Sequence, residues 1–187
     1  ILLFKFLQMK TNKFQPKVSI ILPTYNEEKS IGRMIKEIKK MKKNFTYEIV
    51  VADGGSKDNT VKIAKSEKVL VFEFGKKRGK GIDFRDAALK SNGEYIVQID
   101  ADYQFKPSEI KLLVNALDKG FDIAIGKRID QADAPIVRTL GNFLLSLATS
   151  IAARKYVTDS LAGFKAIRRD KFIKLKIKEH HFGYEAQ

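Results

Sequence analysis

The sequence has no cysteine among its 187 residues, and its only two histidines, His180 and His181, are adjacent. Without thiols, disulfides and thiolate metal sites are excluded. One adjacent pair of histidines also argues against a His-rich zinc site or a Ser-His-Asp triad. No segment approaches the roughly 20 consecutive apolar residues that cross a bilayer. Any membrane contact of this chain is therefore expected to be peripheral.

The chain is long enough for one well-buried domain and short for two. Its composition, 44% apolar and 31% charged, is that of an ordinary globular protein. Residues 1–7 are mostly apolar, but this run is too short to span a membrane and lacks a signal-peptide cleavage pattern. Met9 is a candidate start. We therefore expect residues 1–16 to be an N-terminal extension.

The formal net charge of +14 indicates an anionic partner: nucleic acid, a phosphorylated small molecule or an acidic membrane surface. The lysines of residues 36–43 are best interpreted as a solvated helix face, whereas residues 76–80 form a basic, Gly-containing cluster. No recognised RNA- or DNA-binding signature is present, and the basic residues lack interleaved aromatics. A nucleic-acid-binding module is therefore the weakest of the alternatives.

Strand-like and helix-like segments alternate along most of the chain. The predicted strands are residues 18–22, 47–52, 69–74, 95–99, 121–125 and 164–167. The predicted helices are residues 27–43, 58–66, 81–90 and one that begins near Pro107 and continues through Leu117. This alternation predicts one doubly wound α/β domain with a mainly parallel sheet and helices on both faces. Residues 141–153 carry no charge, which fits either a buried helix or an amphipathic helix in a membrane interface.

The strand at residues 95–99 runs directly into two carboxylates, Asp100 and Asp102, followed by Gln104. Ligands of open α/β sheets bind at the carboxyl ends of the strands. Carboxylate and amide oxygens suit Mg²⁺ or Mn²⁺, especially when a substrate diphosphate supplies further oxygens. The alternative is that both aspartates only cap the turn after the strand.

Two further motifs follow predicted parallel strands. Pro23-Thr24-Tyr25-Asn26-Glu27 follows the first strand, and Asp53-Gly54-Gly55-Ser56 follows the second. Tyr25 could stack on a base or ribose, while Glu27 and Asp53 could accept hydrogen bonds from base or sugar. Taken singly, each motif is explained by a helix start or a tight turn. Their joint placement at one sheet edge favours a ligand site.

These three motifs together resemble family 2 glycosyltransferases of the GT-A fold. Gly126-Lys127-Arg128 and the segment from Asp159 to Lys165, Asp-Ser-Leu-Ala-Gly-Phe-Lys, are similar to the polyprenyl-phosphate branch, which includes dolichyl-phosphate mannosyltransferases and glucosyltransferases. The resemblance implies a Rossmann-like GT-A domain over residues 17–187. Because relatives continue with another strand, a basic loop and often membrane helices, we expect this domain to be truncated at its carboxyl-terminal end.

The resemblance also implies roles for individual residues. Nucleoside contacts are expected from Pro23, Tyr25, Asn26, Glu27 and Asp53. Asp100 and Ala101 would contact the donor, with Asp100 at the ribose or at a metal-bound water. The metal ligands would come from Asp100, Asp102 and Gln104. Arg128 and Arg138 match basic positions that act on the donor diphosphate or acceptor phosphate, and Lys80 is a weaker candidate for this task. Asp159 would act as a base or orient its loop, so the expected catalytic set is Asp102, Arg128 and Asp159.

The implied reaction is inverting transfer of a hexose, mannose or glucose, from GDP-mannose or UDP-glucose to a polyprenyl (dolichyl) phosphate. An ionised lipid phosphate could attack without a side-chain base, whereas a sugar hydroxyl would need a carboxylate such as Asp159. The expected location is the cytoplasmic side of a membrane, with peripheral contact by this chain and membrane helices possible beyond residue 187. The alternatives left open are a glycosyltransferase acting on a sugar hydroxyl and a catalytically silent donor-binding domain.

Overall fold

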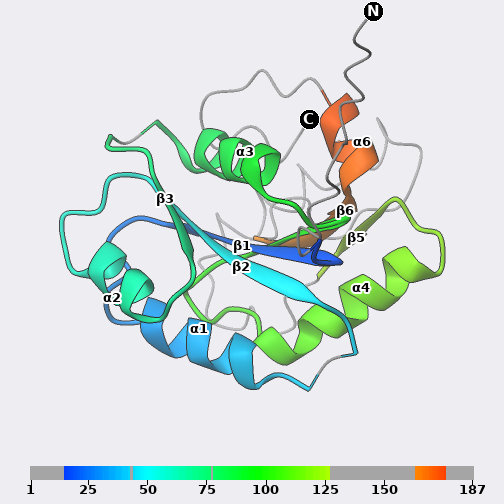
Figure 1. Cartoon of the computed structure of the whole chain (residues 1–187), viewed down its shortest axis with the longest axis horizontal. Coiled ribbons are helices and arrows are strands. Elements are labelled where there is room, and N and C mark those ends of the chain that lie inside the picture. Colours follow the sequence, from blue (N-terminus) through cyan, green and yellow to red (C-terminus); the bar gives the residue numbers. More distant parts are fainter. Residues whose placement is uncertain (1–14, 43, 77, 127–162, 176–187) are drawn as a thin grey trace, which may run out of the picture.

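The computed structural model describes residues 15–42, 44–76, 78–126 and 163–175. Its centre is a six-stranded mixed sheet with strand order β3-β2-β1-β4-β6-β5 (Figure 1). The strands are β1 (Val18–Thr24), β2 (Tyr47–Asp53), β3 (Leu70–Glu73), β4 (Tyr95–Ile99), β5 (Ile123–Ile125) and β6 (Phe164–Arg168). Strands β3, β2, β1 and β4 are mutually parallel, whereas β6 runs antiparallel to both β4 and β5.

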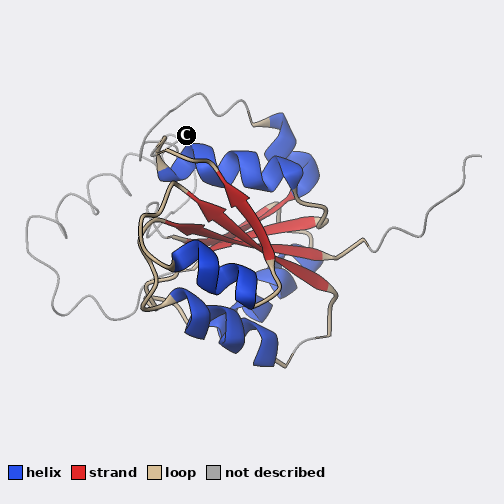
Figure 2. Cartoon of the chain, turned by 60° about the vertical axis from the view of Figure 1, so that its left-hand side comes forward, coloured by secondary structure: helices blue, strands red, loops and turns tan. Residues whose placement is uncertain are grey.

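Helices cover both faces of the sheet, which confirms the predicted α/β fold class (Figure 2). One face carries α1 (Ile31–Lys40), α2 (Thr60–Ser66), the 3₁₀ turn η1 (Pro107–Glu109) and α4 (Ile110–Asp118). The other face carries α3 (Lys80–Lys90) and α6 (Arg169–Lys174). None of the helices in the described ranges is both long and apolar enough to cross a membrane.

Strand β1 divides the core because all seven of its residues are buried. Ile20 and Leu22 belong to the apolar cluster beneath α1 and α4. Ile21, pointing the other way, packs in a second cluster with Phe84 of α3 and Phe172 of α6. A strand that buries both faces needs a continuous apolar run, which is how this segment reads in the sequence.

Several predicted boundaries were wrong, and three of these elements are informative. The first strand does not stop before Pro23 but continues to Thr24. Strand β4 pairs with β1 only as far as Ile21. Beyond Ile21 the β4 side of β1 makes no strand-to-strand hydrogen bonds, so Pro23, which has no N–H, is tolerated there. The helix predicted for residues 27–43 is shorter, because residues 25–30 form a loop held to the neighbouring strand end. The strand predicted from residue 121 begins at Ile123, where pairing with β6 starts.

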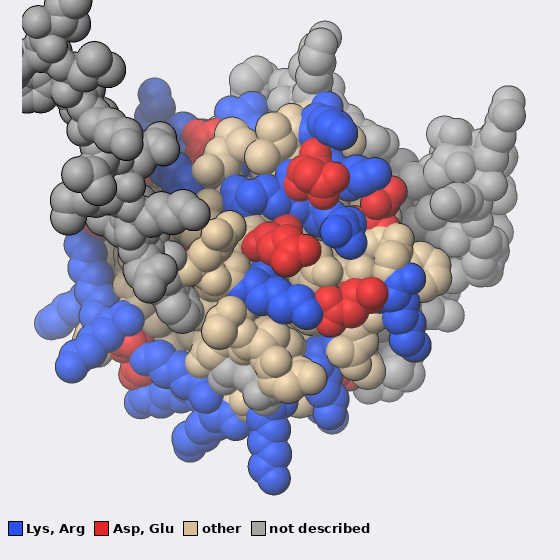
Figure 3. Space-filling model, turned by 45° about the vertical axis from the view of Figure 1, so that its right-hand side comes forward, with Lys and Arg blue, Asp and Glu red and all other residues tan. Residues whose placement is uncertain are grey.

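Basic side chains do not form one compact patch on the face shown in Figure 3. Lysines and arginines are spread over this face, and acidic side chains lie among them. Helix α1 illustrates the pattern, since its buried residues are apolar and its lysines point to solvent or pair with Glu67. This distribution agrees with the interpretation of the α1 lysines as a solvated helix face.

Helix α4 offers a test of the core. Leu117 is fully buried, whereas Leu112 in the same helix is 60% exposed. We expect Leu117→Ala to lower the free energy of unfolding by about 2–5 kcal/mol, because it removes buried apolar surface and leaves a cavity. Leu112→Ala, the matched control, should change it by about 0.5 kcal/mol or less. Denaturant unfolding of both variants measures the difference, and equal losses would contradict this packing.

Candidate active site

The strand order places three polar loops next to one another. Because β1 lies between β2 and β4, and all three are parallel, their carboxyl ends meet at one edge of the sheet. The chain leaves β1 for β2 and β3 on one side and returns for β4 on the other, so the edge is also a topological switch point.

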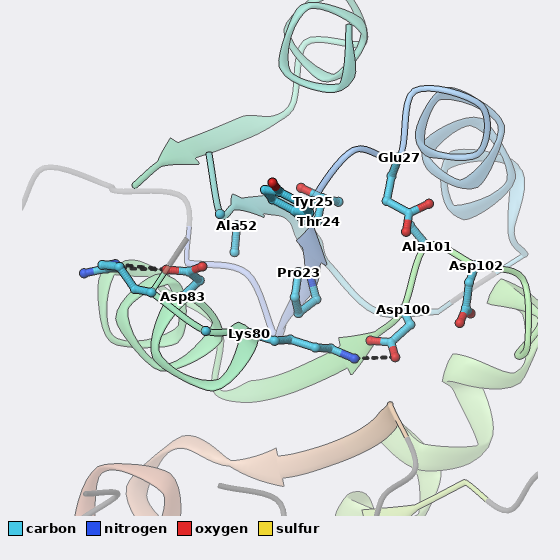
Figure 4. Close-up of a pocket in the computed structure, with 13 residues that line it drawn as sticks. Pro23, Thr24, Tyr25, Glu27, Ala52, Lys80, Asp83, Asp100, Ala101 and Asp102 are labelled. Atoms are coloured by element: carbon cyan, nitrogen blue, oxygen red, sulfur yellow. Dashed lines mark hydrogen bonds and ion pairs between the residues drawn. The ribbon is translucent and has the colours of Figure 1, made fainter. Parts of the chain in front are cut away.

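A pocket of about 410 Å³ opens at this edge (Figure 4). Seven residues predicted for the site line it: Pro23, Tyr25, Glu27, Lys80, Asp100, Ala101 and Asp102. The remaining lining residues are Thr24, Ala52, Gly54, Arg78, Gly79 and Asp83. Three other predicted residues, Asn26, Asp53 and Gln104, lie in the same loops but do not line the pocket.

Asn26 braces the first loop against the second. Its backbone N–H donates to Ser56 Oγ at 2.9 Å, and its side-chain Oδ1 accepts from the Lys57 N–H at 2.9 Å. Asn26 has a left-handed backbone conformation (φ 57°), which asparagine adopts more readily than most residues. The next residue adds a third link, since the Glu27 N–H donates to Thr60 Oγ1 at 2.7 Å.

Asp53 closes its own loop. Oδ2 accepts the N–H groups of Gly55 and Ser56 at 3.0 and 2.9 Å, and Oδ1 accepts the Ser56 hydroxyl at 2.5 Å. The residue is buried. The predicted nucleoside contact of Asp53 stays a prediction.

Asp58 supports the same junction from the start of α2. Burial opposes ionisation of its carboxyl, but hydrogen bonds from the Thr60 hydroxyl and from the N–H groups of Thr60 and Glu28 lower its pKa overall. A carboxyl whose pKa is lowered on folding stabilises the fold above its unfolded pKa and loses that contribution as the pH falls through the folded one.

Asp100 stands at the end of β4 beside Lys80 from the first turn of α3. Lys80 Nζ donates to Asp100 Oδ2 at 2.5 Å, as Figure 4 shows. Asp100 Oδ1 is buried and has no hydrogen-bond partner within the described ranges. A Cβ at Gly163 would lie 1.8 Å from Oδ2, so the carboxylate fits here only because that residue is glycine. The two residues are also joined by the Asp100 N–H, which donates to the Gly163 carbonyl at 3.1 Å.

Asp102 is exposed at the pocket rim, and its Oδ1 accepts the Gln104 N–H at 3.1 Å. Between them Tyr103 has a left-handed backbone (φ 63°), and its ring lies 4.6 Å from the Arg33 guanidinium. Burial is the main cause of the raised pKa of the Tyr103 hydroxyl. The turn after Asp100 is thus tied to α1 through an aromatic side chain.

The carboxylates fit a hard divalent cation. Asp100 contributes a buried oxygen without a partner among the described residues, and Asp102 contributes an exposed one at the same pocket. In the part of the chain that the structure describes, no three His, Cys, Asp or Glu side chains converge on one point. Such a site suits Mg²⁺ or Mn²⁺, which are often held by one or two carboxylates together with substrate phosphates and water.

An Arg78–Asp83 pair, which the sequence analysis missed, forms another part of the pocket wall. Arg78 Nε and NH2 both donate to Asp83 Oδ1, at 3.1 and 2.9 Å, and NH1 donates to Asp86 at 3.1 Å. Burial raises the pKa of the Asp83 carboxyl, with Asp86 and Asp53 adding to the effect and Arg78 opposing it. The sequence signal for this pair was a basic residue before, and an acidic residue after, the helix start predicted at Gly81.

Arg128, Arg138 and Asp159 lie outside the described residues, as does the uncharged segment 141–153. Their predicted roles therefore stay predictions.

Comparison with known proteins identifies the family. The sequence profile of "Glycosyl transferase family 2" matches residues 19–176. The chain belongs to glycosyl transferase family 2. This match takes in all six strands, except Val18 at the start of β1, and all three loops, which confirms the resemblance inferred from the motifs.

Relatives within glycosyl transferase family 2 include two enzymes named for dolichyl or dolichol phosphate. Human dolichyl-phosphate beta-glucosyltransferase is 32% identical over 179 residues, covering 82% of this chain and 55% of the relative. Dolichol-phosphate mannosyltransferase of Pyrococcus furiosus is 33% identical over 164 residues, covering 82% and 47%. The chain therefore spans about half the length of these curated relatives.

Among solved structures of similar fold is glucosyl-3-phosphoglycerate synthase from Mycobacterium tuberculosis, in complex with Mn²⁺, UDP-glucose and phosphoglyceric acid. It superposes with a TM-score of 0.76 and 22% identity, covering 91% of this chain and 62% of the synthase. This likeness shows the Rossmann-like GT-A fold for the family 2 chain.

The contrast between Asp53 and Asp102 yields a stability test. Asp53→Ala should lower the free energy of unfolding by about 1–3 kcal/mol, because it leaves the half-buried N–H groups of Gly55 and Ser56 without their acceptor. Asp102→Ala, which alters an exposed carboxylate in the same site, should change it by about 0.5 kcal/mol or less. Denaturant titration of both variants measures this, and a stable Asp53→Ala protein would show that the loop does not depend on its carboxylate.

Proposed function

We propose that this glycosyltransferase transfers a hexose, mannose or glucose, from a nucleoside diphosphate sugar to a polyprenyl phosphate. The observation that carries the proposal is the pair Asp100 and Asp102 at the switch point of the sheet, in the pocket that the loops of β1, β2 and β4 form. Support for the acceptor comes from the two relatives named as dolichyl-phosphate enzymes.

The donor is proposed to lie along the pocket. Pro23, Tyr25 and Glu27 would contact the nucleoside, and Asp100 with Ala101 would face its sugar or diphosphate side. Asn26 and Asp53 are proposed to act by holding their loops in place, since Asn26 joins the two loops and Asp53 closes its own.

A divalent cation held by Asp100 and Asp102, with Gln104 as a further proposed ligand, would neutralise charge on the departing diphosphate. Lys80 is a described cation at this end of the pocket, since its ammonium lies against Asp100. It would add positive charge where the leaving oxygen becomes negative. The proposed cation is Mg²⁺ or Mn²⁺, and the Mn²⁺ bound by the structurally similar synthase supports this choice.

The acceptor phosphate is proposed to attack the anomeric carbon directly and to invert its configuration. A phosphate monoester is largely ionised near pH 7, since its second pKa is about 6, so no side-chain base is required. Arg128 and Arg138 would hold the phosphates, and Asp159 would orient this region. Attachment to the cytoplasmic face of a membrane is proposed to be peripheral for this chain, helped by its net charge of +14.

Donor binding is tested by calorimetric titration of the chain with UDP and GDP, each with and without Mn²⁺. We expect one nucleotide to bind in a metal-dependent way, and Asp102→Ala to weaken that binding at least about tenfold, since it removes a metal ligand. Asp122→Ala is the matched control, because that exposed carboxylate pairs with Lys171 and does not line the pocket. Equal binding by both variants would exclude the proposed metal site.

The acceptor is tested separately with radiolabelled UDP-glucose and GDP-mannose. Transfer to a short polyprenyl phosphate, with no transfer to free sugars, is the expected result. Transfer to a sugar hydroxyl, lost in Asp159→Asn, would instead support the alternative of a polysaccharide- or glycolipid-forming enzyme, because a hydroxyl acceptor needs a base.

A further inference from the structure

We propose that Asp83 and Arg78 read the base of the donor nucleotide. Asp83 Oδ2 would accept the ring N–H of a lactam base, and Arg78 would donate to the neighbouring carbonyl oxygen. The inference rests on the proposed function, which supplies a uridine or guanosine diphosphate as the donor. It adds two residues to the site and gives them a task that the motif residues do not perform.

Position in the pocket is the first argument. Figure 4 shows Asp83 at one end of the pocket and Asp102 at the other, with Pro23 and Ala52 between them. A nucleoside diphosphate whose phosphates lie at the carboxylates Asp100 and Asp102 must extend its base away from them. The far end of the same pocket is formed by the Arg78–Asp83 pair.

The second argument is which acceptor atoms are still available. Asp53, the predicted nucleoside contact, already accepts two N–H groups through Oδ2 and the hydroxyls of Ser56 and Thr24 through Oδ1. Asp83 instead accepts Arg78 through Oδ1 alone, and the structure describes no hydrogen bond to its Oδ2. Asp83 Oδ2 lies next to Gly54, which also lines the pocket: a Cβ added to Gly54 would be 2.9 Å from this oxygen. The Asp83 side chain is only 5% exposed and lines the pocket, so leaving its oxygen without a donor on ligand binding is costly, which makes it a strong recognition element.

The third argument is that the donor group is held ready. The Arg78 guanidinium is fixed by Asp83, by Asp86 at 3.1 Å and by the Phe74 ring, whose centroid lies 4.3 Å away. A guanidinium with several N–H groups retains donors for a ligand while making these contacts. Its position is therefore set before the nucleotide arrives, which lowers the entropic cost of recognition.

Base chemistry then decides what fits. Uracil presents N3–H beside the O4 carbonyl, and guanine presents N1–H beside O6, so both offer a donor to Asp83 and an acceptor to Arg78. In the same orientation cytosine and adenine present a bare ring nitrogen to the carboxylate and an amino group to the guanidinium. Both contacts are then mismatched. The sugar and diphosphate fix which way the edge faces, so the mismatch cannot be relieved by turning the base.

The experiment is a binding series on the chain with Mn²⁺ and four nucleotides: UDP, GDP, CDP and ADP. UDP or GDP should bind about 10- to 100-fold more tightly than CDP and ADP. The better lactam nucleotide is then compared with its ring-N-methyl form, which lacks the N–H. Methylation should weaken wild-type binding about tenfold or more.

Asp83→Asn keeps the size of the side chain and removes its charge. In this variant the better lactam nucleotide should bind about tenfold more weakly, and the penalty for ring methylation should largely disappear, since the acceptor is no longer matched to the N–H. Asp86→Asn is the control: it also touches Arg78 but does not line the pocket, so it should keep the base preference. Melting curves check that both variants fold.

The outcomes separate this inference from the proposed function. Metal-dependent binding with a methylation penalty that is the same in wild type and Asp83→Asn would overturn the role of Asp83 and leave the donor site standing. Equal affinity for all four nucleotides would overturn it as well. Failure of every nucleotide to bind wild type would overturn the proposed donor site, and this inference with it.

Discussion

The structure depends on one constraint: β1 must pair in parallel with β2 on one side and β4 on the other. This pairing buries every residue of β1 and separates the core into two clusters, one under α1 and α4 and one under α3 and α6. The same pairing brings three strand ends together. The strand pairing that buries β1 and stabilises the fold therefore also places the site at the carboxyl ends of the strands. A change in this pairing would alter both the core and the site.

Hydrogen bonds between loops hold the part of the site that follows β1 and β2. Asn26, Ser56 and Thr60 join the loop after β1 to the loop after β2, while the carboxylate of Asp53 gathers the N–H groups of its own turn. Short polar residues are suited to this task because they bond to nearby backbone groups in turns. Several motif residues thus serve the ligand indirectly, by fixing the loops that carry the residues lining the pocket.

Four of the charged residues that line the pocket form two opposed pairs. Lys80 meets Asp100 near the proposed diphosphate end, and Arg78 meets Asp83 at the other end. Each pair leaves a carboxylate oxygen for which the described residues show no hydrogen bond, Oδ1 of Asp100 and Oδ2 of Asp83. In the proposed complex, the first pair would face the metal-bound diphosphate and the second pair the neutral base. The spread of lysines over the surface is a separate feature.

The sequence by itself determined the fold class, the order of most elements, the family and seven of the residues that line the pocket, because apolar periodicity and short motifs are local properties. The tertiary structure alone decided that Asn26 braces its loop, since its partners Ser56 and Lys57 lie in the turn after β2. It also decided that Pro23 continues β1, that Gly163 must be glycine beside Asp100, and that Asp83 reaches the pocket. Each of these depends on contacts between segments far apart in the chain or on the register of strand pairing, and neither is encoded in local sequence pattern.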